Sequence, residues 1–241
     1  MKLYIVGFGC GSYEGMTLGA KRAIECSDLI VGYTVYAGLI RQYFPDKEYF
    51  CTGMRQELDR VKAALEQAAV GRKVSLICSG DSGVYGMAGL AYQLSPAYPG
   101  VDIEAVPGVT AALSGGALLG APLTADFAVI SLSDLLTPWE KIEKRLRLAA
   151  QADMVISLYN PSSVKRADYL RRACLILLEY LPGDTVCGYA RNIGRNGEEC
   201  AVMPLCKLKD ASVDMFTTIF IGNSQTKNTG GKMVTPRGYN V

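Results

Sequence analysis

Short apolar runs alternate along the chain with segments whose apolar residues recur at helical spacing. The apolar runs end in glycine or polar residues, which is typical of buried strands; they cover 2–8, 28–31, 74–78, 101–106, 127–132, 154–158, 185–190, 200–204 and 217–222. The helical patterns cover 16–26, 36–44, 57–71, 111–119, 140–150 and 166–180. This alternation predicts an α/β fold. The stretch 120–123 resembles a linker and predicts two domains, 1–119 and 120–241.

The stretch 73–89 is the clearest candidate for part of a ligand site. Its strand opens into a loop at 79–83 with two glycines and Asp81, and a helix is expected to begin near Tyr85. Open α/β sheets bind ligands where the carboxyl ends of strands meet such loops. A structural role, with Asp81 capping the helix, accounts for this stretch equally well.

Glycines also follow the first strand, in Gly7-Phe8-Gly9-Cys10-Gly11, which invites a dinucleotide-binding interpretation. That fold requires the spacing G-x-G-x-x-G and an acidic residue at the end of the second strand for the ribose diol. The second strand runs into Gly32-Tyr33-Thr34 and has no such acid. NAD binding is therefore the weakest of the enzymatic hypotheses.

Composition and charge exclude several other classes. The 241 residues carry a net charge of +2 from 25 basic and 23 acidic side chains, so no charge field favours nucleic acid or an anionic membrane. The start of the sequence does not have the pattern of a signal peptide. The most apolar windows, 29–40 and 111–123, are too short to span a bilayer. We expect neither nucleic acid nor membrane as a partner.

The cysteines and the absence of histidine limit the possible chemistry. The eight cysteines form no C-x-x-C pair, and those at 26, 78, 174 and 187 lie in apolar segments, as expected for core residues of a reduced, cytoplasmic protein. The chain has no histidine. A Ser-His-Asp or Cys-His nucleophile, a histidine general base and a zinc site with imidazole ligands are therefore excluded, and no metal-ligand set is evident.

Taken together, four stretches resemble the tetrapyrrole methylases over nearly the whole chain. They are the first glycine loop, Ser79-Gly80-Asp81 with Tyr85, Pro107-Gly108-Val109-Thr110-Ala111 and Leu158-Tyr159-Asn160. The resemblance implies an S-adenosylmethionine-dependent (class III) methyltransferase of two α/β domains with a ligand cleft between them. Three longer stretches, 130–139, 158–163 and 233–239, resemble the branch that methylates C17 of precorrin-3 and contracts the macrocycle in cobalamin biosynthesis.

Two positions depart from the family pattern. Cys10 stands where the family's first loop usually has proline, which is expected to change the loop's shape rather than its activity. Ala125 stands where members of the branch often have histidine, so no role of that histidine can be transferred.

The resemblance implies roles for residues in both domains. Binding of S-adenosylmethionine is assigned to Ser79, Gly80, Asp81, Tyr85, Thr110, Ala111, Asn160, Ala190 and Thr218. The tetrapyrrole substrate carries many carboxylates, and its binding is assigned to Gly9 and Gly11 and to four arginines in or beside predicted loops, Arg55, Arg166, Arg191 and Arg237. For each arginine, the alternative is a solvated surface side chain. A homodimer is also implied.

Ring contraction requires proton movements and carbonyl polarisation, for which Asp126, Ser131 and Asp134 are the candidates. Each has a structural alternative: a cap at the linker, a strand surface position and an Asx turn, respectively. Two other hypotheses stay open, namely another corrin or uroporphyrinogen methylase and a non-catalytic nucleotide-binding protein. Whether cobalt is already in the ring of the substrate also stays open.

Overall fold

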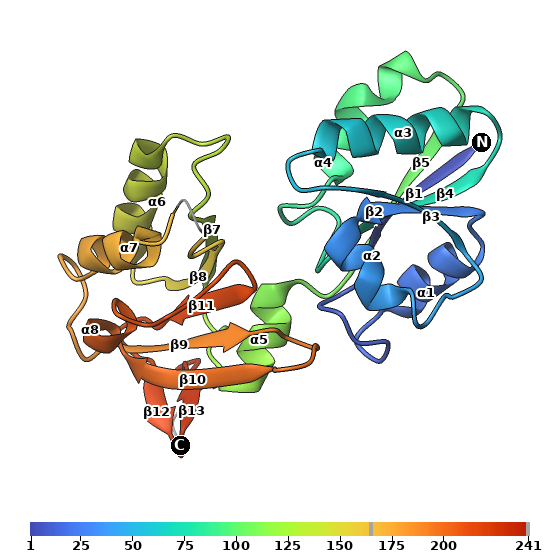
Figure 1. The fold of residues 1–241 in the computed structure, drawn as a ribbon. Helices are drawn as coiled ribbons and strands as arrows, with labels where there is room; N and C mark the ends of the chain where they lie inside the picture. The colour runs from blue at the N-terminus through green and yellow to red at the C-terminus, as the bar shows by residue number, and fades with distance from the viewer. Residues whose placement is uncertain (164–165, 240–241) are drawn as a thin grey trace. The chain divides into compact units, whose positions relative to one another are not determined.

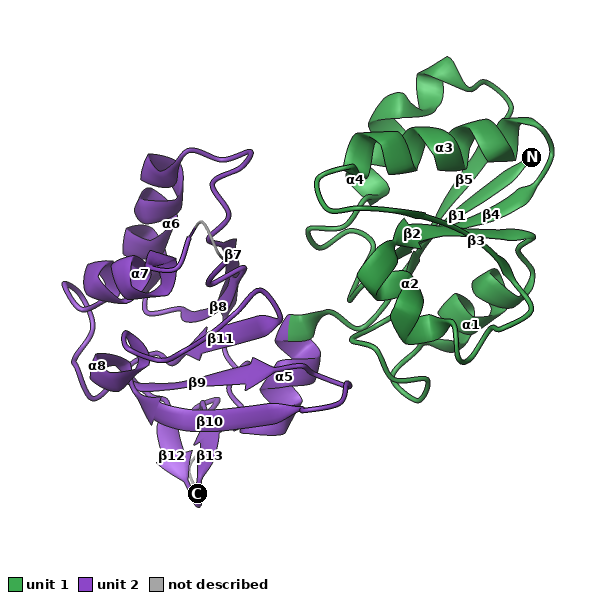
Figure 2. Cartoon of the chain, in the orientation of Figure 1, with its two compact units in different colours: residues 1–111 green, residues 112–241 purple. Residues whose placement is uncertain are grey.

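The chain forms two compact units, residues 1–111 and 112–241, each with its own sheet and core (Figure 1, Figure 2). The structure is a computed structural model that describes residues 1–163 and 166–239. Helix α5 (Ala111–Leu119) lies almost wholly in the second unit, whereas the sequence placed the boundary after residue 119.

The first unit is built on a five-stranded parallel sheet with the order β3-β2-β4-β1-β5. Its strands are β1 (Lys2–Gly7), β2 (Leu29–Tyr33), β3 (Glu48–Thr52), β4 (Lys73–Cys78) and β5 (Asp102–Val106). Its helices are α1 (Leu18–Glu25), α2 (Thr34–Ile40), α3 (Glu57–Ala69), α4 (Ala88–Leu94) and the 3₁₀ turn η1 (Ser95–Ala97).

Helices cover both faces of this sheet, so its central strands are apolar on both sides. On β1, Leu3 and Ile5 pack into the core beneath α3 and α4, while Val6 packs into the core beneath α1 and α2. The chain leaves β1 for α1 on one face and leaves β4 for α4 on the other (Figure 1). The ends of β1 and β4 therefore form a topological switch point, where open α/β sheets bind ligands.

The second unit has a mixed sheet with the order β10-β9-β11-β8-β7, in which only β7 and β8 are parallel. Its strands are β7 (Phe127–Ser131), β8 (Val155–Tyr159), β9 (Val186–Arg191), β10 (Glu199–Pro204) and β11 (Thr217–Ile221). One face packs on α6 (Trp139–Gln151), α7 (Tyr169–Leu177) and α8 (Leu205–Leu208), and the other packs on α5. A small sheet joins β6 (Gly120–Ala121), β12 (Lys227–Thr229) and β13 (Lys232–Val234).

Several local predictions were wrong. Strand β3 and the hairpin β12–β13 were not predicted. Helix α6 begins at Trp139 with Pro138 as its N-cap and no capping side chain. The N-cap of α1 is Thr17, whose hydroxyl accepts a hydrogen bond of 3.0 Å from the Ala20 N–H. Cys26 is exposed at the end of α1 rather than buried.

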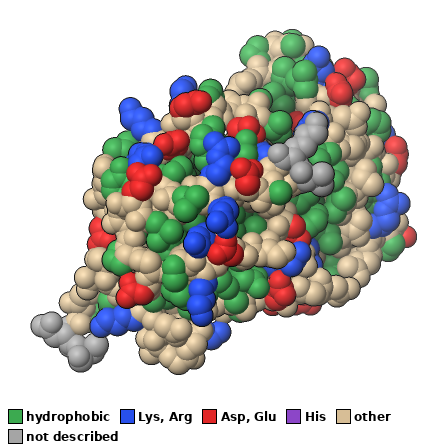
Figure 3. Space-filling view, turned by 60° about the vertical axis from the view of Figure 1, so that its left-hand side comes forward, with side chains coloured by type: hydrophobic (Ala, Val, Ile, Leu, Met, Phe, Trp, Pro, Cys, Tyr) green, Lys and Arg blue, Asp and Glu red, His purple; other side chains and the backbone are tan. Residues whose placement is uncertain are grey.

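The surface shows no segregation of charge on the face seen in Figure 3, where basic and acidic side chains are interspersed with apolar ones. Among the described residues, no helix combines the length and the hydrophobicity that crossing a bilayer would require.

Candidate functional site

The glycine loops after β1 and β4 are joined through their backbones. The Gly9 N–H donates to the Gly80 carbonyl at 3.0 Å, and the Gly80 N–H donates to the Gly9 carbonyl at 2.7 Å. Both residues have a left-handed backbone, with φ of +77° and +71°, which glycine adopts without strain. The bridge holds the two loops together at the switch point of the sheet.

Asp81 holds a third loop, the one that follows β5. One carboxylate oxygen accepts hydrogen bonds from the N–H groups of Gly83 (2.8 Å) and Val84 (3.2 Å), and the other accepts from Gly108 (3.0 Å). The side chain thus forms an Asx turn and also ties β4's loop to β5's loop. With both oxygens engaged by backbone donors, Asp81 shapes the site instead of presenting a free carboxylate.

The three loops approach so closely that side chains would not fit at several positions. A Cβ on Gly108 would lie 2.2 Å from the Gly80 carbonyl oxygen, and one on Gly7 would lie 2.8 Å from it. A Cβ on Gly80 would instead lie 3.5 Å from the Cα of Thr110 and 3.7 Å from the Ala111 nitrogen. The missing side chain of Gly80 therefore leaves a small space bordered by the backbone of Thr110 and Ala111.

Most other predicted residues of the first unit lie at the same edge of the sheet. Because all five strands are parallel, the residues that follow β1, β3, β4 and β5 meet at one edge; they are Gly9, Gly11, Arg55, Ser79, Gly80, Asp81, Tyr85 and Thr110. Arg55 and Tyr85 are exposed and adopt positive φ angles of 65° and 53°. Such backbone conformations in non-glycine residues concentrate at functional sites.

Arg60 of α3 stabilises this edge of the sheet, and the sequence did not predict this role. It is 3% exposed, and its guanidinium donates to the Thr52 hydroxyl (2.8 Å) and the Gly53 carbonyl (2.7 Å), while facing the ring of Tyr33 at 5.7 Å. Burial lowers the pKa of Arg60 from its ordinary value. The contacts anchor the loop that carries Arg55.

In the second unit, polar side chains gather at the carboxyl ends of the parallel strands β7 and β8. The Ser131 hydroxyl accepts hydrogen bonds from the Asn160 side-chain amide (2.9 Å) and from the Ser133 N–H (3.2 Å). Asn160 has φ +54°, a left-handed conformation that asparagine tolerates. These contacts bring together two residues that the sequence assigned to different roles.

A second set of contacts extends this cluster to Asp134 and Arg166. Arg166 donates to the hydroxyls of Ser133 (2.6 Å) and Ser163 (3.1 Å) and lies 3.7 Å from an Asp134 carboxylate oxygen. The other Asp134 oxygen accepts a hydrogen bond of 2.7 Å from the Tyr169 hydroxyl. This hydrogen bond raises the pKa of Tyr169 above its ordinary value. Asp134 is therefore a fixed acceptor held from two sides.

Ala190 and Thr218 lie close to Asn160 across neighbouring strands. Thr218 pairs with Ala190 between β11 and β9, and β8 ends beside them at Tyr159. The Tyr159 hydroxyl accepts a hydrogen bond of 2.8 Å from the Ala112 N–H, which joins the start of α5 to this strand end. Ala190 is fully buried, and a Cβ on Gly115 of α5 would lie 3.1 Å from its methyl group. Any contact of Ala190 with a ligand must use its backbone.

Two predicted residues, Asp126 and Arg237, lie apart from these clusters, whereas Arg191 directly follows Ala190 at the end of β9 but is already paired. Asp126 precedes β7, so it stands at the opposite end of that strand, roughly 16 Å from Ser131. Arg191 already forms ion pairs with Asp214 (2.7 Å) and Glu199 (3.2 Å), which raise its pKa. Arg237 is exposed in the segment after β13.

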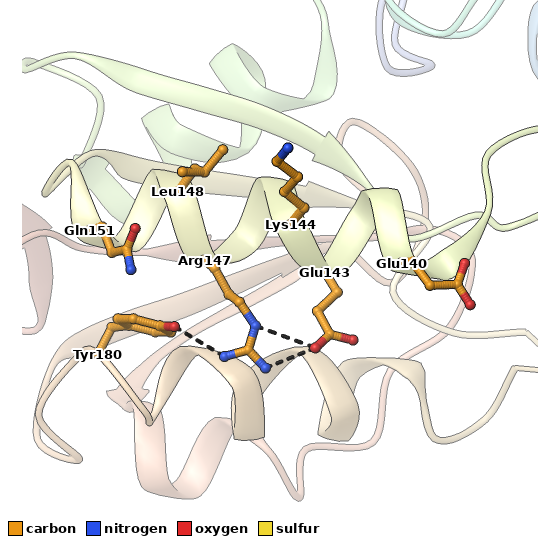
Figure 4. Close-up of a pocket in the computed structure, with 7 residues that line it drawn as sticks. All are labelled: Glu140, Glu143, Lys144, Arg147, Leu148, Gln151 and Tyr180. Carbon is orange, nitrogen blue, oxygen red and sulfur yellow. Dashed lines mark hydrogen bonds and ion pairs between the residues drawn. The ribbon is translucent and has the colours of Figure 1, made fainter.

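A pocket of about 400 Å³ is lined by residues of α6 and by Tyr180, which lies just after α7 (Figure 4). Its lining is Glu140, Glu143, Lys144, Arg147, Leu148, Gln151 and Tyr180. Arg147 donates to Glu143 (2.8 Å) and to the Tyr180 hydroxyl (3.1 Å) and also pairs with Glu179. None of the predicted site residues lines this pocket.

Residues 2–209 match the family model described as Tetrapyrrole (Corrin/Porphyrin) Methylases. The chain belongs to the tetrapyrrole methylase family. The resemblance stated from the sequence motifs is thereby confirmed.

Relatives within the tetrapyrrole methylase family agree over nearly the full chain. The cobalt-factor III methyltransferase of Priestia megaterium is 44% identical over 99% of this chain, which spans only 45% of that relative's length. The probable cobalt-factor III C(17)-methyltransferase of Salmonella typhimurium is 42% identical, and the match covers 99% of this chain and all of that one. The crystal structure of the methyltransferase CobJ matches with a TM-score of 0.89 and 36% identity, covering 97% of this chain and 99% of that chain.

The residues of this tetrapyrrole methylase fit the S-adenosylmethionine that its family implies. That cofactor has no phosphate. Its adenosine therefore needs backbone donors and acceptors and an apolar space, and no phosphate-binding loop is required. The space beside Gly80, which a Cβ would fill, and the backbone of Thr110 and Ala111 offer these features. The two residues that sequence reasoning missed, Arg60 and Tyr169, act on the site through Thr52 and Asp134.

Proposed function

We propose that the chain transfers a methyl group from S-adenosylmethionine to C17 of a corrin precursor, cobalt-precorrin-3 or precorrin-3B, with contraction of the macrocycle, in cobalamin biosynthesis. The observation that carries this proposal is the identity of 42% over the entire length of the Salmonella typhimurium relative named for C17 methylation. The TM-score of 0.89 to CobJ supports it.

Within the first unit, the residues proposed to hold the cofactor are Ser79, Gly80, Tyr85, Thr110 and Ala111. The family resemblance assigns Asn160, Ala190 and Thr218 of the second unit to the same role. Bound S-adenosylmethionine supplies an electrophilic methyl group on a sulfonium, whose sulfur leaves as a neutral thioether. Such a leaving group needs little acid catalysis, and positioning of the reactants can supply on the order of 7–11 kcal/mol. Asp81 serves this positioning through the three backbone N–H groups that it holds.

Proton movements during ring contraction are assigned to the cluster of Ser131 and Asp134. Both lie at the carboxyl ends of parallel strands, and their geometry is fixed by Asn160, Arg166 and Tyr169. A fixed carboxylate can accept a proton or orient a hydroxyl of the substrate. Asp126, at the far end of β7, has no part in this proposal.

The substrate's carboxylates are assigned to Arg55 and Arg166, with Gly9 and Gly11 lining the same edge as Arg55. Arg191 could bind a carboxylate only by giving up its pairs with Asp214 and Glu199. The family resemblance also supports a homodimer in the cytoplasm. Light scattering of the purified protein would test the dimeric state.

The test begins with calorimetric titration of the protein with S-adenosylhomocysteine, with NAD as the control. We expect micromolar binding of the first and none of the second. Incubation with S-adenosylmethionine carrying a ¹³C-methyl group and cobalt-precorrin-3 or precorrin-3B should then yield a ring-contracted product labelled at C17 by NMR. A label on another ring carbon would contradict the C17 assignment, and absence of S-adenosylhomocysteine binding would contradict methyl transfer altogether.

A further inference from the structure

Arg172, in the first turn of α7, presents a fixed guanidinium group with unused hydrogen-bond donors. Its guanidinium carbon lies 4.0 Å from the ring centroid of Trp139 and 5.0 Å from that of Tyr169. Within residues 1–163 and 166–239, its side chain forms no hydrogen bond or ion pair. Stacking on aromatic faces immobilises a guanidinium but leaves the N–H groups at its edge available.

Neighbouring arginines of the second unit differ from Arg172 in this respect. Arg171, the preceding residue, pairs with Asp210. Arg147 on α6 pairs with Glu143 and Glu179. The donors of these two arginines already have carboxylate partners, so they have less to gain from an added anion.

Asp134, the carboxylate next to this group, does not neutralise Arg172. Its oxygens are engaged by the Tyr169 hydroxyl at 2.7 Å and by Arg166 at 3.7 Å. Glu143, one turn along α6 from Trp139, binds Arg147. Among the described residues, Arg172 therefore forms no ion pair with a carboxylate, although it lies near the strand-end cluster of Ser131 and Asp134 and one turn after Asp168.

The location favours a ligand rather than solvent alone. Trp139 opens α6 and Tyr169 opens α7, and these helices follow the loops at the carboxyl ends of β7 and β8. Trp139 and Tyr169 pack against each other with ring centroids 4.7 Å apart, which gives Arg172 a rigid base. Ligands of α/β sheets bind at this edge of a sheet.

We infer that Arg172, stacked on Trp139, binds a carboxylate group of the substrate. The inference rests on the proposed function, which makes the ligand a tetrapyrrole with several acidic side chains. A guanidinium held by its face can engage a carboxylate with two parallel N–H donors, an interaction stronger than a neutral hydrogen bond. Arg172 then acts as a specificity-determining residue outside the reacting centre.

The test compares Arg172→Gln and Arg172→Lys with Arg171→Gln as the matched control on the adjacent position. The purified full chain is titrated with uroporphyrin III, a stable tetrapyrrole polycarboxylate, and binding is followed by the porphyrin's absorbance. Arg172→Gln should weaken binding about tenfold, which corresponds to about 1.4 kcal/mol, and Arg172→Lys should fall between it and the wild type. Arg171→Gln should bind as the wild type does.

Two further measurements separate the possible failures. Thermal unfolding of each variant reports whether loss of the stack on Trp139 has disturbed the fold. Titration with S-adenosylhomocysteine reports on the proposed function independently of the carboxylate site. Equal uroporphyrin affinity in Arg172→Gln and wild type, with S-adenosylhomocysteine still bound, would overturn the role of Arg172 and leave the methyltransferase assignment standing.

In turnover, the Arg172→Gln variant should raise KM for the corrin substrate about tenfold with kcat nearly unchanged, because the lost contact binds a remote part of the substrate. A merely structural role would instead lower kcat and the unfolding temperature together. That result would also overturn the inference.

Discussion

Gly9 and Gly80 exchange two backbone hydrogen bonds, of 3.0 Å and 2.7 Å, across the switch point of the first sheet. Gly9 and Gly80 belong to loops that lead to helices on opposite faces of the sheet. The two hydrogen bonds therefore hold the loops after β1 and β4 together at the point where the chain turns toward opposite faces of the sheet. What remains open to a ligand is the side of Gly80 that faces Thr110 and Ala111.

Substitutions at Gly80 should separate stability from cofactor binding. Gly80→Ala is expected to cost about 1–2 kcal/mol of unfolding free energy because its φ is +71°, and Gly80→Asn less, since asparagine tolerates this conformation. Both should weaken S-adenosylhomocysteine binding about tenfold, because both fill the space beside Thr110.

Gly71 provides the control for that pair. Its φ is +100°, but a Cβ there would meet nothing within 4 Å. Gly71→Ala should lose comparable stability in urea titrations while calorimetry shows unchanged affinity for S-adenosylhomocysteine. If Gly80→Asn also binds normally, the loop after β4 is not part of the cofactor site.

Two fully buried serines should respond oppositely to replacement by alanine. The Ser157 hydroxyl on β8 has no hydrogen-bond partner in the described part of the chain, whereas the Ser75 hydroxyl on β4 bonds to the Ser27 hydroxyl at 2.8 Å and to the Ala23 carbonyl at 3.1 Å. Ser75→Ala should destabilise by about 1–2 kcal/mol, because it removes both of these bonds, while the Ser27 hydroxyl keeps its own bond of 2.7 Å to the Ala23 carbonyl. Ser157→Ala should be neutral or stabilising in the same urea titration, since it relieves a desolvated hydroxyl. A larger loss for Ser157→Ala than for Ser75→Ala would contradict this account.

The pair of Asp214 and Arg191 should make stability depend on acid pH. Burial opposes ionisation of Asp214, but hydrogen bonds from Arg191, the Phe216 N–H and Thr217 outweigh it, so the pKa of Asp214 lies below its ordinary value of 3.8. A depressed folded-state pKa contributes stability above the unfolded-state pKa, and this contribution is lost as pH falls through the folded value. Asp214→Asn should cost about 1 kcal/mol at pH 7, after allowance for solvent screening, and less at pH 3. Urea midpoints that differ equally at both pH values would rule out this linkage.

Cysteine alkylation should distinguish surface from core thiols. Cys26, Cys200 and Cys206 are exposed and should react with iodoacetamide at pH 8 in the native protein. Burial raises the pKa of Cys78 to about 11 and that of Cys174 to about 12, so both should stay protonated and unmodified until urea unfolds the chain. Peptide mass spectrometry gives the order of modification, and labelling of Cys174 before Cys206 would show that the second core opens readily.

Sequence pattern predicted two helices best. Helix α5 has the predicted bounds, and α3 begins at the predicted residue. Strand β3 escaped prediction because it is an edge strand with an exposed and partly polar sequence, so its only signal is pairing with β2. Helix α6 begins at Trp139, one residue before the predicted start, and Pro138, with ψ of 143°, is its N-cap.

The place of a candidate site residue in the fold could be predicted where the residue lies at the end of a strand. Ser131 is the last residue of β7 and Asn160 follows β8, a parallel strand, so the strand pattern was sufficient to place them at one edge. Arg172 and Tyr169 depend on how α6 packs against α7, which no local pattern encodes. Arg60 sits among apolar residues of an amphipathic helix, and its hydrogen bonds to Thr52 and Gly53 arise only in the folded unit.

The strand order of the first sheet also has a consequence for synthesis. Strand β1 does not pair with β2, the next strand to be made, but with β4, so that Lys2 lies opposite Lys73. At a translation rate of about 5–20 residues per second, the partner of β1 reaches the growing chain seconds later. Until then an apolar strand is exposed at the ribosome, and the first unit cannot complete its fold.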